Sequence, residues 1–564
     1  MSRWLSRSVF AGVTAFFAVF FLLPLAGTVR TALTDAQGEL TLEFLLEVFR
    51  NPLYREGLLN AAVIAVLTTL GCLLVAMPLA LLSVRYRFPG QTLLSALLLM
   101  PLILPPFVGA LGMQAMLGQA GALNSGLIAA GLMSAQQPVD WLGEGRLAGV
   151  VLMNVLHLYP IVYLNLSASL SQVDPTLEEA AASLGCPPWR RFWRVTLPLT
   201  WPGVLAGCSI AFIWAFTELG VPLMFDYDRV TAVQIFNALK DLSNNPFPSA
   251  LVVVLLGFST VFYAASRRLM RHDVSAGGGR ATLARVPVAL TGMAGLACAG
   301  LFGSVIALAL WPHVGVVLMA LSGDWYQTVL PAQMTLAHFQ VALGHELTLT
   351  SIANSLQYSS WATLLDLVLG LAVAWIVVRG TERGRAWLDA LAMLPLAVPG
   401  IVMAFGYLAL SREGQPLHGL IRGDDPWLLL VAAYALRRLP YVVRSVSAGL
   451  QQISPSLEEA ARTLGAPPLR TLWRITVPLL APSLLAGGLL AFAFAMLEVS
   501  DSMILAQRTI HFPITKALYT LSATLGDGPA QAAALGVWSM VFLSVTLIGA
   551  GVILGRRLGA LFRA

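Results

Sequence analysis

The chain has 564 residues, of which 57% are hydrophobic and only 11% are charged, and its formal net charge is +6. Soluble domains carry roughly 25% charged residues, so this composition excludes an ordinary soluble protein. The four cysteines are scattered and none stands in a Cys-x-x-Cys pair, which gives no indication of a disulfide framework or a zinc site. We predict a polytopic membrane protein without a metal site.

Long apolar runs recur along the whole chain and predict the membrane spans. Each has about 20 residues or more, enough for a helix to cross ~30 Å of hydrocarbon. The first run follows Arg3 and Arg7 as in a signal peptide, but no clear cleavage site follows it, so we expect a retained helix. The predicted fold class is all-α, with about twelve transmembrane helices at 8–29, 58–84, 93–117, 147–170, 203–225, 249–266, 288–321, 354–378, 388–410, 427–450, 483–505 and 531–555.

The distribution of basic residues indicates membrane orientation rather than nucleic-acid binding. If the N-terminus is cytoplasmic and the spans alternate, the cytoplasmic segments hold roughly twice as many arginines and lysines as the outward ones. Arg437, Arg438 and Arg444 fall within the span expected at 427–450. Both termini are therefore expected in the cytoplasm, and nucleic acid is not an expected partner.

The two halves of the chain repeat each other. The segment MPLILPPFVGALG at 100–112 matches LPLAVPGIVMAFG at 394–406, at an offset of 294 residues. Because proline removes a backbone donor from a helix, the prolines are expected to kink the third and ninth spans. We interpret them as setting helix shape, with a gate hinge as the alternative. The match aligns Pro101 with Pro395, Pro105 with Pro399 and Gly112 with Gly406.

Each half contains six predicted spans. An even number inserts both halves in the same orientation, so we expect parallel repeats about an axis normal to the membrane. The first half covers 1–266 and the second covers 288–564. Between them, 267–287 carries a basic cluster and the sequence SAGGGR, which predicts a flexible cytoplasmic linker.

A charged segment occurs twice, each time between apolar runs on the side expected to be cytoplasmic. LEEAAASLGCPPWRRFWRVTLP at 177–198 and LEEAARTLGAPPLRTLWRITVP at 457–478 lie 280 residues apart. Since this offset is about 14 residues shorter than the first, the first half carries an insertion, which we place in the outward loop 118–146. A soluble segment repeated so closely within an apolar chain favours a docking surface.

Each copy carries the signals of a short helix followed by a turn, in loops 174–198 and 454–478. Aspartate or serine before proline predicts a cap and a first helical residue, and two glutamates in the first turns match the helix dipole. A glycine then predicts a left-handed end, and a Pro-Pro pair separates this helix from a second, basic one. In chain order the residues are Asp174, Pro175, Glu178, Glu179, Gly185 and the helix Trp189 to Arg194, then Ser454, Pro455, Glu458, Glu459, Gly465 and the helix Leu469 to Arg474.

These loops resemble the signature loop of type I ABC importer permeases, the inner membrane components of binding-protein-dependent transport systems. The signature is Glu-Ala-Ala, three residues, Gly, nine residues and Ile-x-Leu-Pro. The resemblance covers roughly 50–270 and 345–555, and the fused tandem form is most similar to ferric-iron importer permeases, with thiamine and aminoalkylphosphonate relatives. The matching residues are Glu179-Ala180-Ala181, Gly185 and Val195 to Pro198, then Glu459-Ala460-Ala461, Gly465 and Ile475 to Pro478, with Val195 and Val477 as departures.

The resemblance implies a coupling helix in each half that docks on one of two copies of an ATPase subunit. ATP and Mg²⁺ would act through that partner, because Lys240 and Lys516 follow leucine and threonine and cannot complete a phosphate-binding loop. This chain is thus expected to be no enzyme and to bind no cofactor. It also implies a bacterial inner membrane location and a periplasmic solute-binding protein. The implied coupling residues are Glu178, Glu179, Ala180, Ala181, Gly185, Glu458, Glu459, Ala460, Ala461 and Gly465.

Ionisable residues at membrane depth are costly and mark candidate sites. The 280-residue offset aligns Glu218 with Glu498 and His157 with Arg437, and Arg438 and Asp501 lie nearby. We favour ion pairs of the two glutamates with His157 and Arg437 within each half. The alternative is a translocation pathway, in which the carboxylates favour a cation and the arginines favour an anion. Asp366, alone in its span, is interpreted as a helix contact.

The sequence therefore predicts the permease subunit of an ATP-driven importer. Its outward segments are too short to form a binding domain, which agrees with solute capture by a separate protein. Ferric iron is the favoured solute, and an aminoalkylphosphonate or phosphorylated compound, thiamine or a polyamine are alternatives. An ion-coupled secondary transporter is the alternative of a different class, and a membrane enzyme or scaffold is the weakest, since no metal-binding motif is present.

Overall fold

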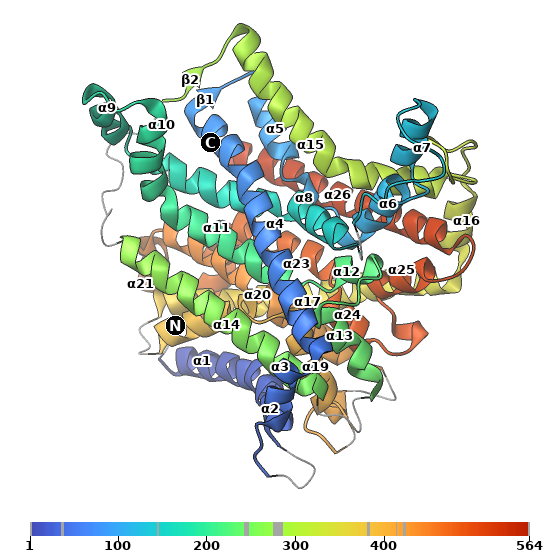
Figure 1. Cartoon of the computed structure of the whole chain (residues 1–564). Helices are drawn as coiled ribbons and strands as arrows, with labels where there is room; N and C mark the ends of the chain where they lie inside the picture. The colour runs from blue at the N-terminus through green and yellow to red at the C-terminus, as the bar shows by residue number, and fades with distance from the viewer. Residues whose placement is uncertain are drawn as a thin grey trace.

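The computed structural model describes residues 3–34, 39–143, 146–241, 247–274, 286–380, 384–412, 414–420 and 425–561. Within these ranges the protein is built from helices, with two strands of two residues each (Figure 1). The helices of the first half are α1 (Arg3–Phe17), η1 (Ala18–Leu22), α2 (Leu23–Leu33), α3 (Glu43–Arg50), α4 (Pro52–Arg85), α5 (Gln91–Leu97), η2 (Met100–Leu102), α6 (Pro106–Leu117), α7 (Ala122–Ala129), α8 (Leu147–Ser171), α9 (Pro175–Ser183), α10 (Pro188–Arg191), η4 (Phe192–Thr196), α11 (Leu197–Thr217), α12 (Gly220–Met224), α13 (Thr231–Asn237), η5 (Ala238–Asp241) and α14 (Phe247–Val274).

The second half follows the same plan. It contains α15 (Gly292–Leu321), α16 (Ala337–Gly344), α17 (Glu346–Arg379), α18 (Arg385–Met393), η6 (Leu394–Leu396), α19 (Gly400–Leu410), η7 (His418–Leu420), α20 (Trp427–Gln452), α21 (Pro455–Thr463), α22 (Pro468–Thr471), η8 (Leu472–Thr476), α23 (Val477–Met496), α24 (Ser500–Leu505), η9 (Thr509–His511), α25 (Ile514–Ser522) and α26 (Gly528–Leu561).

The apolar helices account for all the predicted spans. In the described part of the chain nine helices are long and apolar enough to cross a membrane, and two bent helix pairs bring the number to 11. The twelfth is α20, whose 26 residues suffice for a span but include Arg437, Arg438 and Arg444. The prediction of an all-α fold with about twelve spans is confirmed.

Four of the predicted spans are broken rather than continuous. The run 93–117 bends by 93° between η2 and α6, and the run 388–410 bends by 97° between η6 and α19. Pro105 and Pro399 precede α6 and α19, and proline both lacks a donor and keeps the residue before it out of the helical conformation. The runs 203–225 and 483–505 also break, after Thr217 and after Met496, so the prediction of single helices there is wrong.

The halves are interleaved. The first membrane helix of each half packs against the other half: α15 packs on α6, and α2 packs on α19. Two glycines permit this approach. A side chain at Gly112 would overlap the carbonyl of Pro312 and lie 2.6 Å from the backbone nitrogen of Val316. One at Gly406 would lie 2.8 Å from the carbonyl oxygen of Pro24. The matched glycines of the repeat thus make equivalent contacts between the halves.

The junction between the halves differs in part from the predicted linker. Helix α14 continues to Val274, so 267–274 is helical and not linker, because no helix-breaking residue interrupts it. The SAGGGR segment at 275–280 lies outside the described residues. After it, β2 (Val288–Ala289) pairs in parallel with β1 (Tyr86–Arg87) at the end of α4. The second half therefore begins attached to the first.

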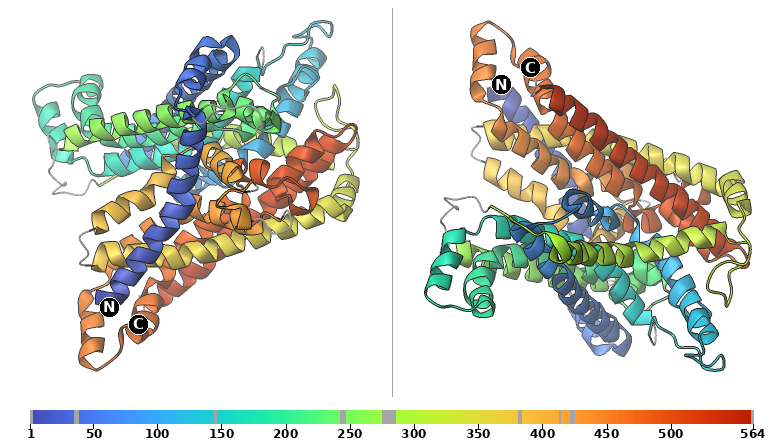
Figure 2. Two further views of the ribbon diagram at one scale, coloured as in Figure 1. Left: turned by 90° about the horizontal axis from the view of Figure 1, so that it is seen from below. Right: turned by 90° about the horizontal axis from the view of Figure 1, so that it is seen from above.

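The two ends of the molecule differ. The loops that carry α9 and α21 lie at one end, on the left of Figure 1, and the ends of α1 and α26 lie at that same end (Figure 2). Helices α7, α16 and α25 lie at the opposite end. The repeated loops and both termini therefore share one side of the molecule.

Candidate functional site: coupling loops and central cavity

The local signals of the repeated loops give the expected helices. Asp174 Oδ1 accepts a 2.9 Å hydrogen bond from the Thr176 nitrogen, and Ser454 Oγ accepts one of 3.4 Å from the Ser456 nitrogen. Gly185 and Gly465 have φ angles of 77° and 81°. These angles lie in the left-handed region, where glycine ends a helix without a side-chain clash. The predicted caps of α9 and α21 are confirmed.

The basic segments Trp189 to Arg194 and Leu469 to Arg474 are not separate short helices, so the prediction of a second short helix in each loop is wrong. Pro188 to Thr217 form one helix of 30 residues, and Pro468 to Met496 form one of 29. Each passes through a π-helical segment, η4 or η8, without a break, although Pro198 and Pro202 follow the Pro-Pro turn in the first copy and Pro478 and Pro482 in the second. The loop thus leads directly into the membrane helix.

Glu178 and Glu458 bind their own chain. Glu178 is buried, and its Oε1 lies 2.6 Å from Arg85 Nη2 and accepts a hydrogen bond from Thr196 Oγ1. In the second half, buried Glu458 Oε1 lies 3.7 Å from Arg379 Nε and 3.4 Å from the Thr476 hydroxyl. Arg85 and Arg379 end α4 and α17. These glutamates therefore fasten the short helices to the membrane domain.

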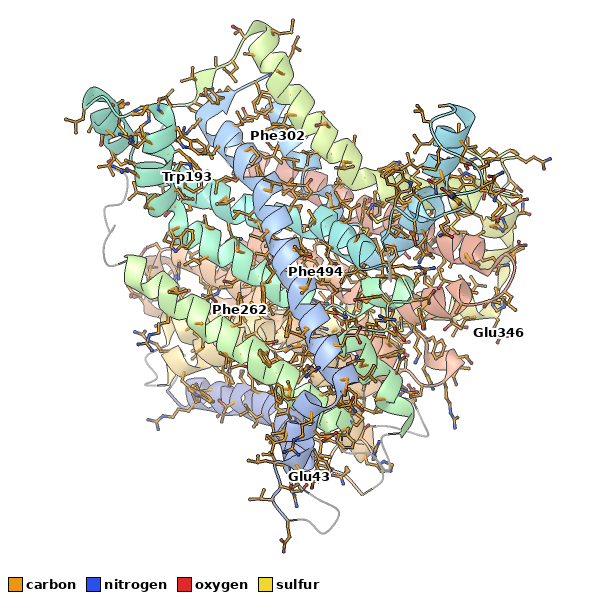
Figure 3. The ribbon with its side chains drawn as sticks, viewed as in Figure 1. Glu43, Trp193, Phe262, Phe302, Glu346 and Phe494 are labelled. Carbon is orange, nitrogen blue, oxygen red and sulfur yellow. The ribbon has the colours of Figure 1, made fainter. Side chains whose placement is uncertain are left out.

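The remaining loop residues form an exposed surface. Ala181 is half-buried and Ala461 is buried, while Leu184 and Leu464 are each 88% exposed. An exposed apolar cluster with charged neighbours marks a protein interface. Trp193 shows the position of this surface in Figure 3. The exposed residues are Glu179, Ala180, Leu184, Gly185, Trp189 and Trp193 in the first copy and Glu459, Ala460, Leu464, Gly465, Leu469 and Trp473 in the second.

A cavity lies where the two halves meet, with about 670 Å³ of empty space that includes open solvent. The broken third and fifth spans of both halves line it together with the fourth spans, α8 and α20, near Phe494 in Figure 3. The structure brings five of the six predicted pathway residues to its wall: His157, Glu218, Arg437, Arg438 and Glu498. Asp501 does not line the cavity and is fully buried behind it.

In the second half the acid is paired. Glu498 forms ion pairs through Oε1 with Arg437 Nη1 and through Oε2 with Arg438 Nη2. The Arg438 guanidinium also lies 5.5 Å from the ring centroid of Phe494, a cation–π distance. A side chain at Gly400 would overlap the Arg437 guanidinium and displace it from its present position. The predicted pairing of Glu498 with Arg437 is confirmed, with Arg438 as a second partner.

In the first half the predicted pair is not formed. Glu218 Oε1 accepts hydrogen bonds from the backbone nitrogens of Gly220 at 2.9 Å and Val221 at 3.3 Å. His157 Nδ1 lies 2.7 Å from the Pro101 carbonyl oxygen. A break after α11 exposes free backbone donors beside Glu218, and these satisfy it in place of the imidazole. The prediction of a pair between Glu218 and His157 is wrong.

One protein family matches both halves of the chain. The family described as "Binding-protein-dependent transport system inner membrane component" matches residues 50–274 and 366–557. The chain belongs to this family. It is a multi-pass inner-membrane transport subunit in tandem form, as the repeated loops predict. The matched segments leave out α1, α2 and α15, the helices exchanged between the halves.

Relatives named for ferric iron match most of this permease. A Haemophilus influenzae protein named as a ferric transport system permease, FbpB 1, is 27% identical over 82% of this chain and 70% of its own length. The ferric transport system permease FbpB of Actinobacillus pleuropneumoniae is 27% identical over 81% of this chain and 64% of its own. A Salmonella paratyphi A protein named as a 2-aminoethylphosphonate transport system permease, PhnU, is 31% identical over 45% of this chain and 90% of its own.

Sequence reasoning missed two aromatic residues of the permease cavity. Trp214 and Phe494 occupy equivalent positions at the 280-residue offset, and their ring centroids lie 6.3 Å apart across the boundary between the halves. Both line the cavity. The repeat could have indicated both residues, because each stands four residues, about one helical turn, before the aligned glutamate.

Replacing Glu178 by alanine is expected to loosen α9. The change removes the acceptor for Arg85 and Thr196, and a lost buried partner costs about 1–3 kcal/mol. Amide hydrogen exchange in α9 should accelerate accordingly in the full-length permease. Glu179→Ala, one residue later on the exposed face, is the matched control and should leave exchange unchanged. Equal exchange in both variants would contradict the fastening role of Glu178.

Proposed function

We propose that this permease forms the pathway through which an ATP-driven importer moves ferric iron into the cytoplasm. The observation that carries the proposal is the pair of equivalent loops, α9 and α21, at one end of a molecule whose central cavity holds Glu218 and Glu498. The ferric relatives align across both halves, which supports iron as the solute.

Two copies of an ATPase subunit would bind α9 and α21, one on each. Glu179 and Ala180 in α9, with Glu459 and Ala460 in α21, would contact it, while Ala181 and Ala461 would pack behind them. Gly185 and Gly465 would set the ends of the docking helices. ATP and Mg²⁺ would be bound by the ATPase. This chain would supply no catalytic residue and hold no cofactor.

The geometry offers a direct route from ATPase to cavity. The helix that starts at Pro188 rises from the docking loop and ends at Thr217, next to Glu218. At 1.5 Å per residue its 30 residues extend ~45 Å. The second copy runs from Pro468 to Met496, two residues before Glu498. Closure of the ATPase dimer would move these two helices and so rearrange the cavity wall.

The docking loops define the cytoplasmic side in this proposal. Both termini would then be cytoplasmic, in agreement with the excess of basic residues on that side. Helices α7, α16 and α25 would face the periplasm, where a soluble binding protein would deliver the solute. The lipid bilayer would surround the exposed apolar faces of α4, α14 and α15.

A second candidate solute is an aminoalkylphosphonate. The guanidiniums of Arg437 and Arg438 in the cavity suit an anion, and PhnU is 31% identical over nearly its whole length. Iron is favoured because both guanidiniums are already engaged by Glu498.

Uptake of radioactive ferric iron tests the proposal. Cells that lack this chain are complemented with wild type, with Glu179→Arg/Glu459→Arg, or with the control Glu346→Arg, an exposed acid at the opposite end of the molecule (Figure 3). Wild type and the control should restore uptake, and the double variant should not, because reversed charges at both loops block ATPase docking. Full uptake by the double variant would contradict ATP coupling and favour a secondary transporter. If wild type restores uptake of 2-aminoethylphosphonate but not of ferric iron, the phosphonate and not iron is the solute.

A further inference from the structure

Two buried acids of the second half have no role in the ion pairs described so far. Asp366 and Asp501 are fully buried, and neither carboxylate has a hydrogen-bond partner in the described part of the chain. The repeat aligns Asp366 with Cys72 and Asp501 with Val221. The fold therefore does not require an acid at either position, and the cost of burying one points to a function.

Asp366 lies level with Arg438. Helices α17 and α20 run side by side in the same direction, since Tyr358 contacts Tyr434 near their starts and Gly370 meets Val442 further along. Asp366 stands one turn before Gly370, and Arg438 stands one turn before Val442. Arg438 Nε is also buried without a hydrogen-bond partner. An unpartnered acid and an unpartnered guanidinium nitrogen thus face the same level of one helix pair.

Each arginine of the cavity therefore has a second acid within reach. Arg437 Nη1 lies 3.7 Å from Asp501 Oδ2, and Asp366 stands at the level of Arg438 on the adjacent helix α17. Removing the partner of a buried charge is strongly unfavourable when nothing replaces it. With Asp501 and Asp366 present, Glu498 can release both guanidiniums without leaving either one unpaired.

The cavity wall and the buried residues around it hold four acids and two arginines. Glu218 and Glu498 line the cavity with Arg437 and Arg438, while Asp501 and Asp366 are buried outside its lining. Only Oε1 of Glu218 is hydrogen-bonded within the described residues, so its carboxylate retains binding capacity. A side chain at Gly220 would lie 3.2 Å from Glu218 Oε1 and 3.3 Å from Val499, so the two acid-bearing segments meet.

We infer that Glu218 and Glu498 are the binding pair for a hard, multivalent metal cation in transit, and that Asp501 and Asp366 take over Arg437 and Arg438 while Glu498 binds it. This rests on the proposed function and assigns the solute class to the cavity. Carboxylate oxygens are the ligands that hard cations prefer. Among the described residues no three histidine, cysteine or acidic side chains gather to hold a metal. With only two carboxylates as protein ligands, the other coordination positions of the cation are left to water. Such a site suits a cation that passes through better than one that is retained.

Equilibrium dialysis with radioactive ferric citrate tests the inference on the full-length permease in lipid nanodiscs. Wild type should bind ferric ion, and Glu218→Gln and Glu498→Gln should not. Asp366→Asn and Asp501→Asn should each weaken binding about tenfold or more, because Glu498 can then leave only at the cost of an unpaired guanidinium. The control Asp389→Asn, a partly exposed acid paired with Arg444 at 3.7 Å, should bind as wild type does.

Two further variants separate partner exchange from a structural effect. Asp366→Glu keeps the carboxylate and should bind nearly as wild type. In Asp366→Asn/Arg438→Gln the guanidinium that needs the second acid is gone, so binding should recover. Thermal unfolding of each variant identifies any that fails to fold. Normal binding by folded Asp366→Asn, or no recovery in the double variant, would overturn the exchange.

Competition distinguishes the ligand class. If inorganic phosphate or 2-aminoethylphosphonate binds instead, and Arg437→Gln abolishes that binding, the cavity is an anion site and the inference is wrong. If wild type binds no ferric ion while the ATPase still co-purifies and Glu179→Arg/Glu459→Arg releases it, the inference fails and the importer function stands. If no ATPase associates with wild type, the proposed function itself fails.

Discussion

Replacing Gly112 by alanine is expected to lower the free energy of unfolding of the permease by about 1–3 kcal/mol, the cost typical of an overpacked contact. The added methyl group would overlap the Pro312 carbonyl and lie 2.6 Å from the Val316 nitrogen, and both belong to the backbone of α15. Backbone cannot turn aside as a side chain can, so α15 and α6 must separate. Because these helices come from different halves, the change weakens the attachment between the halves.

The measurement is denaturant unfolding of the full-length permease in detergent. Gly300→Ala and Gly303→Ala, on the same helix α15, are matched controls because nothing lies within 4 Å of a side chain at either position. They should raise stability by up to about 1 kcal/mol, since alanine favours a helix over glycine. The equivalent change Gly406→Ala should destabilise as Gly112→Ala does. A stabilising effect of Gly112→Ala would show that the halves are not held together at this contact.

The exchange of first helices explains why the repeat preserves these glycines. Sequence alone aligned Gly112 with Gly406 but gave no reason for them, because their partners, Pro312 and Pro24, lie in the opposite halves. A sequence repeat shows which positions are equivalent. It does not show whether the residue that packs against such a position comes from the same half or from the other half. Only the three-dimensional arrangement identifies the first helix of the other half as the partner.

Local signals were predictable because their causes are local. Asp174 with Pro175 and the glycine at 185 determine the ends of α9 through hydrogen bonds and dihedral angles within a few residues. The prolines predicted the kink of the third span, but the break after Thr217 was not predicted, because an apolar run looks the same whether it is one helix or two. Pro105 indicates a disturbance, but the 93° bend depends on what packs against each part.

The sequence predicted most residues of the cavity site but only part of their ion pairs. Glu218 and Glu498, aligned by the 280-residue offset, line the same cavity, as expected of equivalent positions on facing halves. Their partners differ because the residues that face them differ: Arg437 and Arg438 in the second half are His157 and Leu158 in the first. The His157 imidazole, whose Nδ1 lies 2.7 Å from the Pro101 carbonyl oxygen, does not draw Glu218 away from the free amides of Gly220 and Val221. The halves are thus alike at the repeated loops and unlike at the cavity.

Replacing both Leu184 and Leu464 by aspartate is expected to abolish stable association with the ATPase. Both side chains are 88% exposed at the ends of α9 and α21, so they contribute nothing to the fold of the isolated permease. Burying one leucine at an interface contributes about 1.5–3 kcal/mol. Loss of both therefore removes about 3–6 kcal/mol, which corresponds to roughly a 10²- to 10⁴-fold loss of affinity.

Co-purification of the ATPase with the full-length permease, quantified against wild type, provides the measurement. Each single variant should retain part of the association through the unchanged loop, since the two loops are equivalent and separate. Leu330→Asp is the matched control, because Leu330 is 61% exposed in the segment between α15 and α16, at the opposite end of the molecule. Full association of the double variant would mean that α9 and α21 are not the docking helices, and the route from ATPase through α11 and α23 to Glu218 and Glu498 would lose its starting point.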